Sequence, residues 1–276
     1  MTADALSAGR ICAVAGQVQR EMQGWARRYP ELYKAEAFDP ALFSSLALAY
    51  AFSAPWLDAA GLRTVNKVCF WAFGLDWLVD YAATSRDDLD PLLARVAGVA
   101  AGDGPVDELT AFLVEVRDDL DAAAPHLREV WREELGLMLG GMSREWDWKR
   151  SGDLPDLDGY LANADNIGFS FVFTGHWIGT GGEGDVSAVI KASRAVQCVL
   201  RLLNDLGSIE RDRKWGDLNA LLLGVEEDVV RARLAELTVS AEELLAPLPP
   251  GLADYLQRQM EFCSGFYGVS DFWVAG

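Results

Sequence analysis

Apolar residues recur along the whole chain at the three- and four-residue spacing of helices, and strand-like alternation of apolar and polar residues is hard to find. Proline and glycine fall between the periodic segments, where they begin or end helices. The pattern therefore predicts an all-α protein. We expect helices over 4–28, 40–53, 62–84, 88–100, 105–123, 126–150, 157–178, 186–213, 217–223, 226–246 and 251–268.

The segment 62–84 has no polar face over much of its length, which is typical of a helix surrounded by other helices. Asp76 and Asp80 interrupt its apolar run. Four residues of helix rise about 6 Å, so both carboxylates are expected to point the same way. Two like charges on a buried helix are costly unless something cationic neutralises them.

No internal repeat and no long linker divides the chain, so the simplest arrangement is one domain spanning residues 1–276. Of the 276 residues, 51% are hydrophobic and ten are Trp, which is enough for a sizeable core. The charge balance is 24 Lys and Arg against 42 Asp and Glu, a net charge of −18. This balance argues against nucleic acid and anionic membranes as partners.

The four cysteines lie far apart and form no CxxC pair, which favours reduced cysteines in a cytoplasmic protein. The N-terminus has no charged-then-apolar leader, and no run of about 18 apolar residues could span a membrane. The sequence leaves the oligomeric state open, a homodimer included.

The most informative polar pattern is a row at four-residue spacing within the expected helix 186–213. Asn204, Ser208 and Asp212 share one face of that helix. Three hard oxygen ligands in a row suit Mg²⁺, which fills the rest of its octahedron with water and phosphate oxygens. The same face carries Arg201 one turn earlier, and Arg211 stands beside Asp212; we expect both to reach phosphate oxygens.

The segment Asn204-Asp205-x-x-Ser208-x-x-x-Asp212, followed by Gly216-Asp217-x-Asn219, resembles the second metal-binding motif of class I terpene synthases. That pattern ends in Glu where this chain has Asp212, and a Lys often precedes it where this chain has Arg211. Upstream, Asp76-Trp77-Leu78-Val79-Asp80 is similar to the family's Asp-rich motif, with Trp77 in place of a second Asp.

The resemblance implies a single-domain helical bundle around a central apolar pocket, with three Mg²⁺ bridging the diphosphate of an allylic substrate. Asp76 and Asp80 would hold one part of this cluster, and Asn204, Ser208 and Asp212 another. Aromatic faces would stabilise the allylic cation left by ionisation. The expected pocket residues are Phe73, Trp77, Phe169, Phe173, Trp177 and Trp273.

Two departures from the family pattern concern the diphosphate. Family members usually carry an Arg in the segment matching residues 160–168 and an Arg-Tyr pair near the C-terminus. The first segment has no Arg here, and the last Arg is Arg258. Asn163 and Asn166 are alternative polar contacts for the diphosphate, but a role at a helix kink or cap fits them equally well.

The resemblance is greatest to bacterial diterpene synthases that act on copalyl diphosphate and release a labdane or pimarane-type product, a carbon–oxygen lyase reaction. Alternatives are cyclases of geranylgeranyl or farnesyl diphosphate, a trans-prenyl diphosphate synthase, and a non-catalytic protein that binds prenyl lipids. A prenyl diphosphate synthase would have a second Asp-rich motif, where this chain has Asn204 and Ser208.

Overall fold

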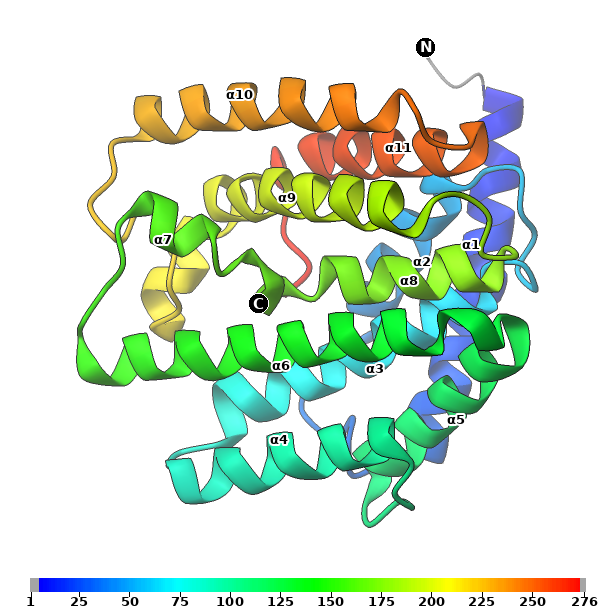
Figure 1. Cartoon of the computed structure of the whole chain (residues 1–276), viewed down its shortest axis with the longest axis horizontal. Coiled ribbons are helices and arrows are strands. Elements are labelled where there is room, and N and C mark those ends of the chain that lie inside the picture. The colour runs from blue at the N-terminus through cyan, green and yellow to red at the C-terminus, as the bar shows by residue number, and fades with distance from the viewer. Residues whose placement is uncertain (1–4, 274–276) are drawn as a thin grey trace. The chain divides into compact units, whose positions relative to one another are not determined.

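The computed structural model describes residues 5–273, and helices are the only regular secondary structure in that range. The prediction of an all-α protein is confirmed, and the helices can be followed by colour in Figure 1. They are α1 Ala5–Arg28, α2 Pro40–Ser53, α3 Arg63–Trp77, α4 Arg86–Ala101, α5 Glu108–Ala123, α6 Arg128–Ser151, α7 Leu157–Leu161, α8 Phe169–Gly179, α9 Val186–Trp215, α10 Glu227–Leu245 and α11 Pro250–Tyr267.

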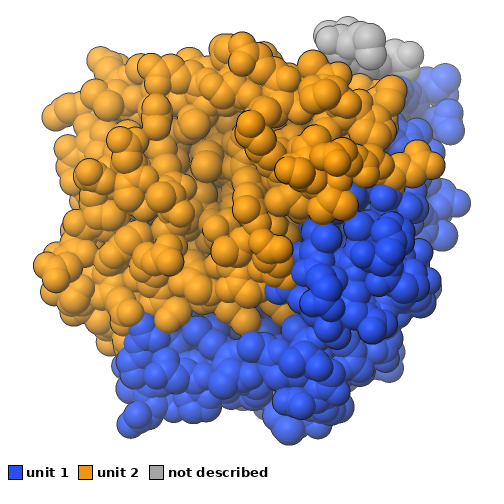
Figure 2. All heavy atoms as spheres, viewed as in Figure 1, with its two compact units in different colours: residues 1–132, 172–182 blue, residues 133–171, 183–276 orange. Residues whose placement is uncertain are grey.

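The chain forms two compact units, each assembled from two stretches of sequence. The first unit comprises residues 1–132 and 172–182, and the second comprises residues 133–171 and 183–276; Figure 2 colours them blue and orange. A single domain over residues 1–276 stays a prediction. Among residues 5–273, no helix is long and apolar enough to cross a membrane.

In the first unit, α3 contacts α1, α2 and α5. Its residues from Val65 to Ala72 are all buried, as expected for a helix that is apolar on every side. Two polar side chains among these buried residues of α3 have partners on other helices. The indole N–H of Trp71 donates to the carbonyl oxygen of Leu109 at 2.9 Å. Lys67 forms an ion pair with Asp119 on α5.

The predicted helix 62–84 changes its hydrogen-bonding pattern near its end. After Trp77 the chain continues as a π-helix over Leu78–Ala82, closed by a bond from the Ala83 N–H to the Leu78 carbonyl oxygen at 2.9 Å. Asp76 precedes this change and Asp80 lies within it. Single π-turns are rare and occur often at functional sites.

In the second unit, α9 is the central element. It contacts α10, α11 and the short 3₁₀ segment Ala164–Ile167, and Figure 1 shows α9, α10 and α11 running side by side. The Asp185 side chain caps its N-terminus by accepting from the Ala188 N–H at 2.9 Å. Gly216, with φ +79°, ends the helix in the left-handed region.

Two predicted helices of this part of the chain differ in the structure. The segment 157–178 is not one helix, because the chain turns at Gly168 with φ +68° between α7 and α8. The segment 217–223 is a turn, in which the N–H groups of Leu222 and Leu223 donate to the Asn219 carbonyl oxygen. In both places a side chain accepts from a backbone N–H that a continuous helix would bond to its own carbonyl oxygens. Gln197 Oε1 accepts from the Ser170 N–H at 2.9 Å, and Asp205 Oδ2 accepts from the Ala220 N–H at 3.0 Å.

Candidate active site

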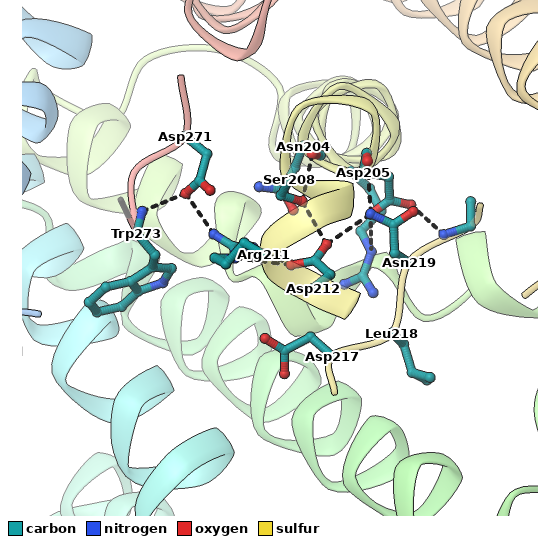
Figure 3. A network of polar contacts seen from close by, with 12 residues as sticks. Asn204, Asp205, Ser208, Arg211, Asp212, Asp217, Leu218, Asn219, Asp271 and Trp273 are labelled. Atoms are coloured by element: carbon teal, nitrogen blue, oxygen red, sulfur yellow. Dashed lines mark hydrogen bonds and ion pairs between the residues drawn. The ribbon is translucent and has the colours of Figure 1, made fainter. Parts of the chain in front are cut away.

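The oxygen row predicted from spacing lies along α9, and Figure 3 shows its three side chains one turn apart. Ser208 Oγ is 2.8 Å from the Asn204 carbonyl oxygen and 2.6 Å from Asp212 Oδ2. Ser208 and Asp212 are 1% and 2% exposed, so neither is part of a solvated surface stripe. The structure places the three predicted ligands along one helix, and it brings the side chains of Ser208 and Asp212 into direct contact.

Asn219 fixes the orientation of Asp212. Its Nδ2 donates to Asp212 Oδ2 and to the carbonyl oxygen of Asp205, both at 2.8 Å, while its Oδ1 accepts from the Leu221 N–H at 3.0 Å. Asn219 is fully buried. The sequence places Asn219 in the motif, but its contact with Asp212 depends on the turn after Gly216 and was not predicted.

Arg211 binds the other oxygen of Asp212. Its Nε and Nη2 donate to Asp212 Oδ1 at 3.0 and 2.6 Å, and its Nη1 donates to Asp271 Oδ1 at 2.7 Å. One guanidinium therefore joins the motif helix to the segment after α11, as Figure 3 shows. No pattern in the sequence indicates this role for Asp271. It lies 60 residues after Arg211, in an irregular segment.

The chemistry of this donor set fits Mg²⁺. An amide, a hydroxyl and a carboxylate offer hard oxygens, and Ser208 Oγ and Asp212 Oδ2 are 2.6 Å apart, near the roughly 3 Å edge of an octahedron with bonds of about 2.1 Å. In residues 5–273, no three His, Cys, Asp or Glu side chains form a metal-ligating cluster.

Arg201, one turn before Asn204, lies in a buried polar network instead of an open groove. Its Nε donates to the Tyr160 hydroxyl at 2.7 Å, its Nη2 donates to Glu145 Oε2 at 2.9 Å, and its Nη1 bonds to Asn166. Burial alone would lower the pKa of Arg201, but Glu145 and its other partners raise that pKa well above the ordinary value. A diphosphate contact for Arg201 stays a prediction.

Asp205 anchors the turn that carries Asn219. Its Oδ2 accepts from the Ala220 N–H at 3.0 Å and its Oδ1 accepts from the Tyr160 hydroxyl at 3.0 Å. Burial raises the pKa of Asp205 to about 7, although the nearby Arg201 guanidinium opposes this rise. Asp205 thus has a structural role, because its buried carboxylate fixes the turn that carries Asn219.

The segment that lacks the expected Arg receives two guanidinium groups from other helices. Arg144 of α6 donates to Asn163 Oδ1 at 2.7 Å, and Arg201 of α9 bonds to Asn166. Asn163 also donates to the Gly141 carbonyl oxygen at 3.0 Å. These bonds give Asn163 a place at the helix break; a role in substrate binding stays a prediction.

Of the other predicted residues, Phe169 and Trp273 are buried in the second unit, and the rest belong to the first unit. Asp76, Asp80, Phe73 and Trp77 are partly buried, at the end of α3 and in the π-helix. The Trp77 ring lies 4.8 Å from the Tyr81 ring and 5.8 Å from the Phe38 ring, centroid to centroid. Phe173 and Trp177 of α8 are fully buried.

Comparison with known proteins gives a match to one family model over more than half of the chain. Residues 67–229 match the model described as terpene synthase family 2, C-terminal metal binding. The chain is also 28% identical to the ent-pimara-9(11),15-diene synthase of Streptomyces sp. (strain KO-3988), an alignment that covers 94% of this chain and 92% of the relative.

Solved structures of bacterial terpene synthases share this fold. The linalool/nerolidol synthase of Streptomyces clavuligerus, in complex with 2-fluorogeranyl diphosphate, superposes with a TM-score of 0.71 at 20% identity over 92% of this chain and 97% of that one. The 2-methylisoborneol synthase of Streptomyces coelicolor A3(2), in complex with Mg²⁺ and 2-fluorogeranyl diphosphate, gives a TM-score of 0.71 at 17% identity over 91% of both chains.

Proposed function

Since the chain belongs to terpene synthase family 2, C-terminal metal binding, and is a class I terpene cyclase, we propose that it converts copalyl diphosphate to a labdane or pimarane-type diterpene with Mg²⁺. The observation that carries this proposal is the oxygen row Asn204, Ser208 and Asp212, in which Ser208 and Asp212 are buried and in direct contact. Similarity to a pimaradiene synthase over nearly the whole chain supports the choice of substrate.

We assign the metal ligands as predicted: Asn204, Ser208 and Asp212 on α9, with Asp76 and Asp80 as further ligands. Three Mg²⁺ are the number that the resemblance implies. When bound, Mg²⁺ supplies Lewis-acid stabilisation of the charge on the departing diphosphate. In an acidic protein of net charge −18, the metal also supplies the positive charge that a diphosphate needs.

The residues around the row would prepare it for this ligand. Asn219 holds Asp212 Oδ2 at 2.8 Å, which would fix the orientation of this carboxylate for a metal. Arg211 neutralises the second oxygen and carries guanidinium N–H groups suited to phosphate oxygens. Phe73, Trp77, Phe173 and Trp177 are the aromatic rings that we assign to stabilising the carbocation.

Product analysis with Mg²⁺ and three substrates tests the proposal. With copalyl diphosphate we expect a tricyclic hydrocarbon or a labdane alcohol, and with excess chelator we expect none. A product from geranylgeranyl or farnesyl diphosphate alone would move the assignment to another cyclase substrate. A lengthened diphosphate would indicate a prenyl diphosphate synthase, and binding without turnover would indicate a prenyl-lipid binding protein.

A further inference from the structure

The end of α11 and the segment that follows it run along the motif side of α9. The Tyr267 hydroxyl makes a hydrogen bond with the Asn204 side chain. One turn further, Gly207 approaches Tyr267 so closely that a Cβ at residue 207 would lie 2.6 Å from the Tyr267 carbonyl oxygen. Asp271 then binds Arg211. The chain after α11 therefore follows the motif helix from residue 204 to residue 211.

Asp271 anchors this segment to α9 through its carboxylate, which accepts two hydrogen bonds. Asp271 Oδ1 accepts from Arg211 Nη1 at 2.7 Å and from the Trp273 N–H at 2.6 Å. Its side chain is 10% exposed, so this ion pair is shielded more than a surface pair. Figure 3 shows Arg211 between Asp271 on one side and Asp212 on the other.

Arg211 consequently uses one edge of its guanidinium for Asp212 and its Nη1 for Asp271. A guanidinium N–H binds carboxylate and phosphate oxygens with the same geometry. Because Arg211 adjoins the ligand Asp212, a diphosphate oxygen that approaches Nη1 competes with the Asp271 carboxylate for the charge and the N–H group of this guanidinium nitrogen.

We propose that Asp271 is a positioning residue that occupies, on Arg211, the place of a diphosphate oxygen. Binding of magnesium diphosphate at the row Asn204, Ser208 and Asp212 replaces Asp271 on Arg211 Nη1 and releases the segment 268–273 from α9. This inference rests on the proposed function, because it requires a diphosphate at that row. By linkage, whatever weakens the Asp271–Arg211 pair strengthens diphosphate binding.

Calorimetric titration with inorganic diphosphate in MgCl₂ measures this competition on the full-length chain. Asp271→Asn keeps an oxygen for the Trp273 N–H but loses the charge that competes for Arg211. We expect it to bind diphosphate about tenfold more tightly than the unmodified chain, the effect of one charge-assisted hydrogen bond. Asp271→Glu retains the competing charge, and we expect affinity near that of the unmodified chain.

Asp254→Asn is the matched control, because Asp254 is an exposed acid on α11 and its replacement changes the net charge equally. We expect it to shift the affinity less than twofold. Hydrogen exchange over residues 268–273 is the second readout. Diphosphate with MgCl₂ should speed this exchange in the unmodified chain, and Asp271→Asn should show fast exchange before any ligand is added.

Equal or weaker diphosphate binding by Asp271→Asn than by Asp254→Asn overturns the inference, as does exchange at 268–273 that slows or stays unchanged when the unmodified chain binds diphosphate. The proposed function survives both of those results. Failure of the unmodified chain to bind diphosphate in MgCl₂ overturns the inference and the proposed function together.

Discussion

The two helices that carry the predicted metal ligands hold them in different ways. On α9, both oxygens of Asp212 have partners: Ser208 and Asn219 bind Oδ2, and Arg211 binds Oδ1. At the end of α3, the backbone changes from an α-helix to a π-helix between Asp76 and Asp80, and both side chains are partly exposed.

The two sites differ in what fixes the position of the predicted ligands. The α9 row is fixed by side chains from the following turn and from the segment after α11, so removing one partner disturbs the others. In the Asp-rich segment the backbone itself changes, because a π-turn resets the direction of the residues after it. We therefore expect substitutions in the α9 row to cost more activity than substitutions in the Asp-rich segment.

The largest effect should come from the row itself. Asn204→Ala and Ser208→Ala should each lower kcat/KM about a hundredfold or more, comparable to removing a preorganised electrostatic contact. Ser240→Ala is the control for Ser208→Ala, because the Ser240 hydroxyl also donates to the carbonyl oxygen four residues earlier, at an exposed position of α10. Circular dichroism must remain helical, and near-normal rates in both row variants would refute the metal role of α9.

A smaller effect should follow when the partner of a ligand is changed. Asn219→Asp keeps the size of the side chain but places a carboxylate where Nδ2 donates to Asp212 Oδ2 at 2.8 Å. We expect the half-saturating Mg²⁺ concentration to rise ten- to a hundredfold, as for other residues that orient a ligand. An unchanged Mg²⁺ dependence in the folded variant would show that the row does not need this support.

The Asp-rich segment gives the third comparison. Asp76→Asn should lower kcat/KM about tenfold, because it removes the charge of one carboxylate from the predicted ligands but keeps an oxygen at that position. Asp80→Asn should lower it less, because Asp76 takes the first position of the motif. Steady-state kinetics of the two variants under one assay decides the ranking, and a harmless Asp76→Asn reverses it.

Trp77→Ala should have the smallest effect on the reaction rate, but it should change the ratio of products. A ring that stabilises the cation contributes about 2 kcal/mol when desolvated. Its loss should alter the product mixture and increase water-quenched alcohol. If Trp77 only packs against Tyr81 and Phe38, the variant will melt earlier with unchanged products. Trp56→Ala, which removes an exposed ring, is the control.

Much of the fold follows from the sequence because helix period and end signals are local. The start of α2 at Pro40 and the end of α6 near residue 150 agree with their predicted positions. The break at Gly168 was missed because the apolar period continues on both sides of it. The π-turn at 78–82 was missed because the 3.6-residue period contains no sign of an extra residue in the turn.

The site divides in the same way. The row Asn204, Ser208 and Asp212 could be predicted because its spacing matches a helical turn. The residues that support this row could not be predicted. Asn219 contacts Asp212 only because the chain turns between them, and Asp271 lies in a segment without helical periodicity. Contacts between residues far apart in sequence arise from tertiary packing, which no local pattern records.

Anomalous scattering from crystals soaked in Mn²⁺ and inorganic diphosphate tests the central claim most directly, because Mn²⁺ occupies sites with the oxygen ligands that Mg²⁺ prefers. We predict a metal peak within about 2.2 Å of the side-chain oxygens of Asn204, Ser208 and Asp212, with diphosphate oxygens completing its coordination. Metal and diphosphate bound elsewhere, with the Ser208–Asp212 hydrogen bond of 2.6 Å intact, would contradict the assignment of this row as the metal site.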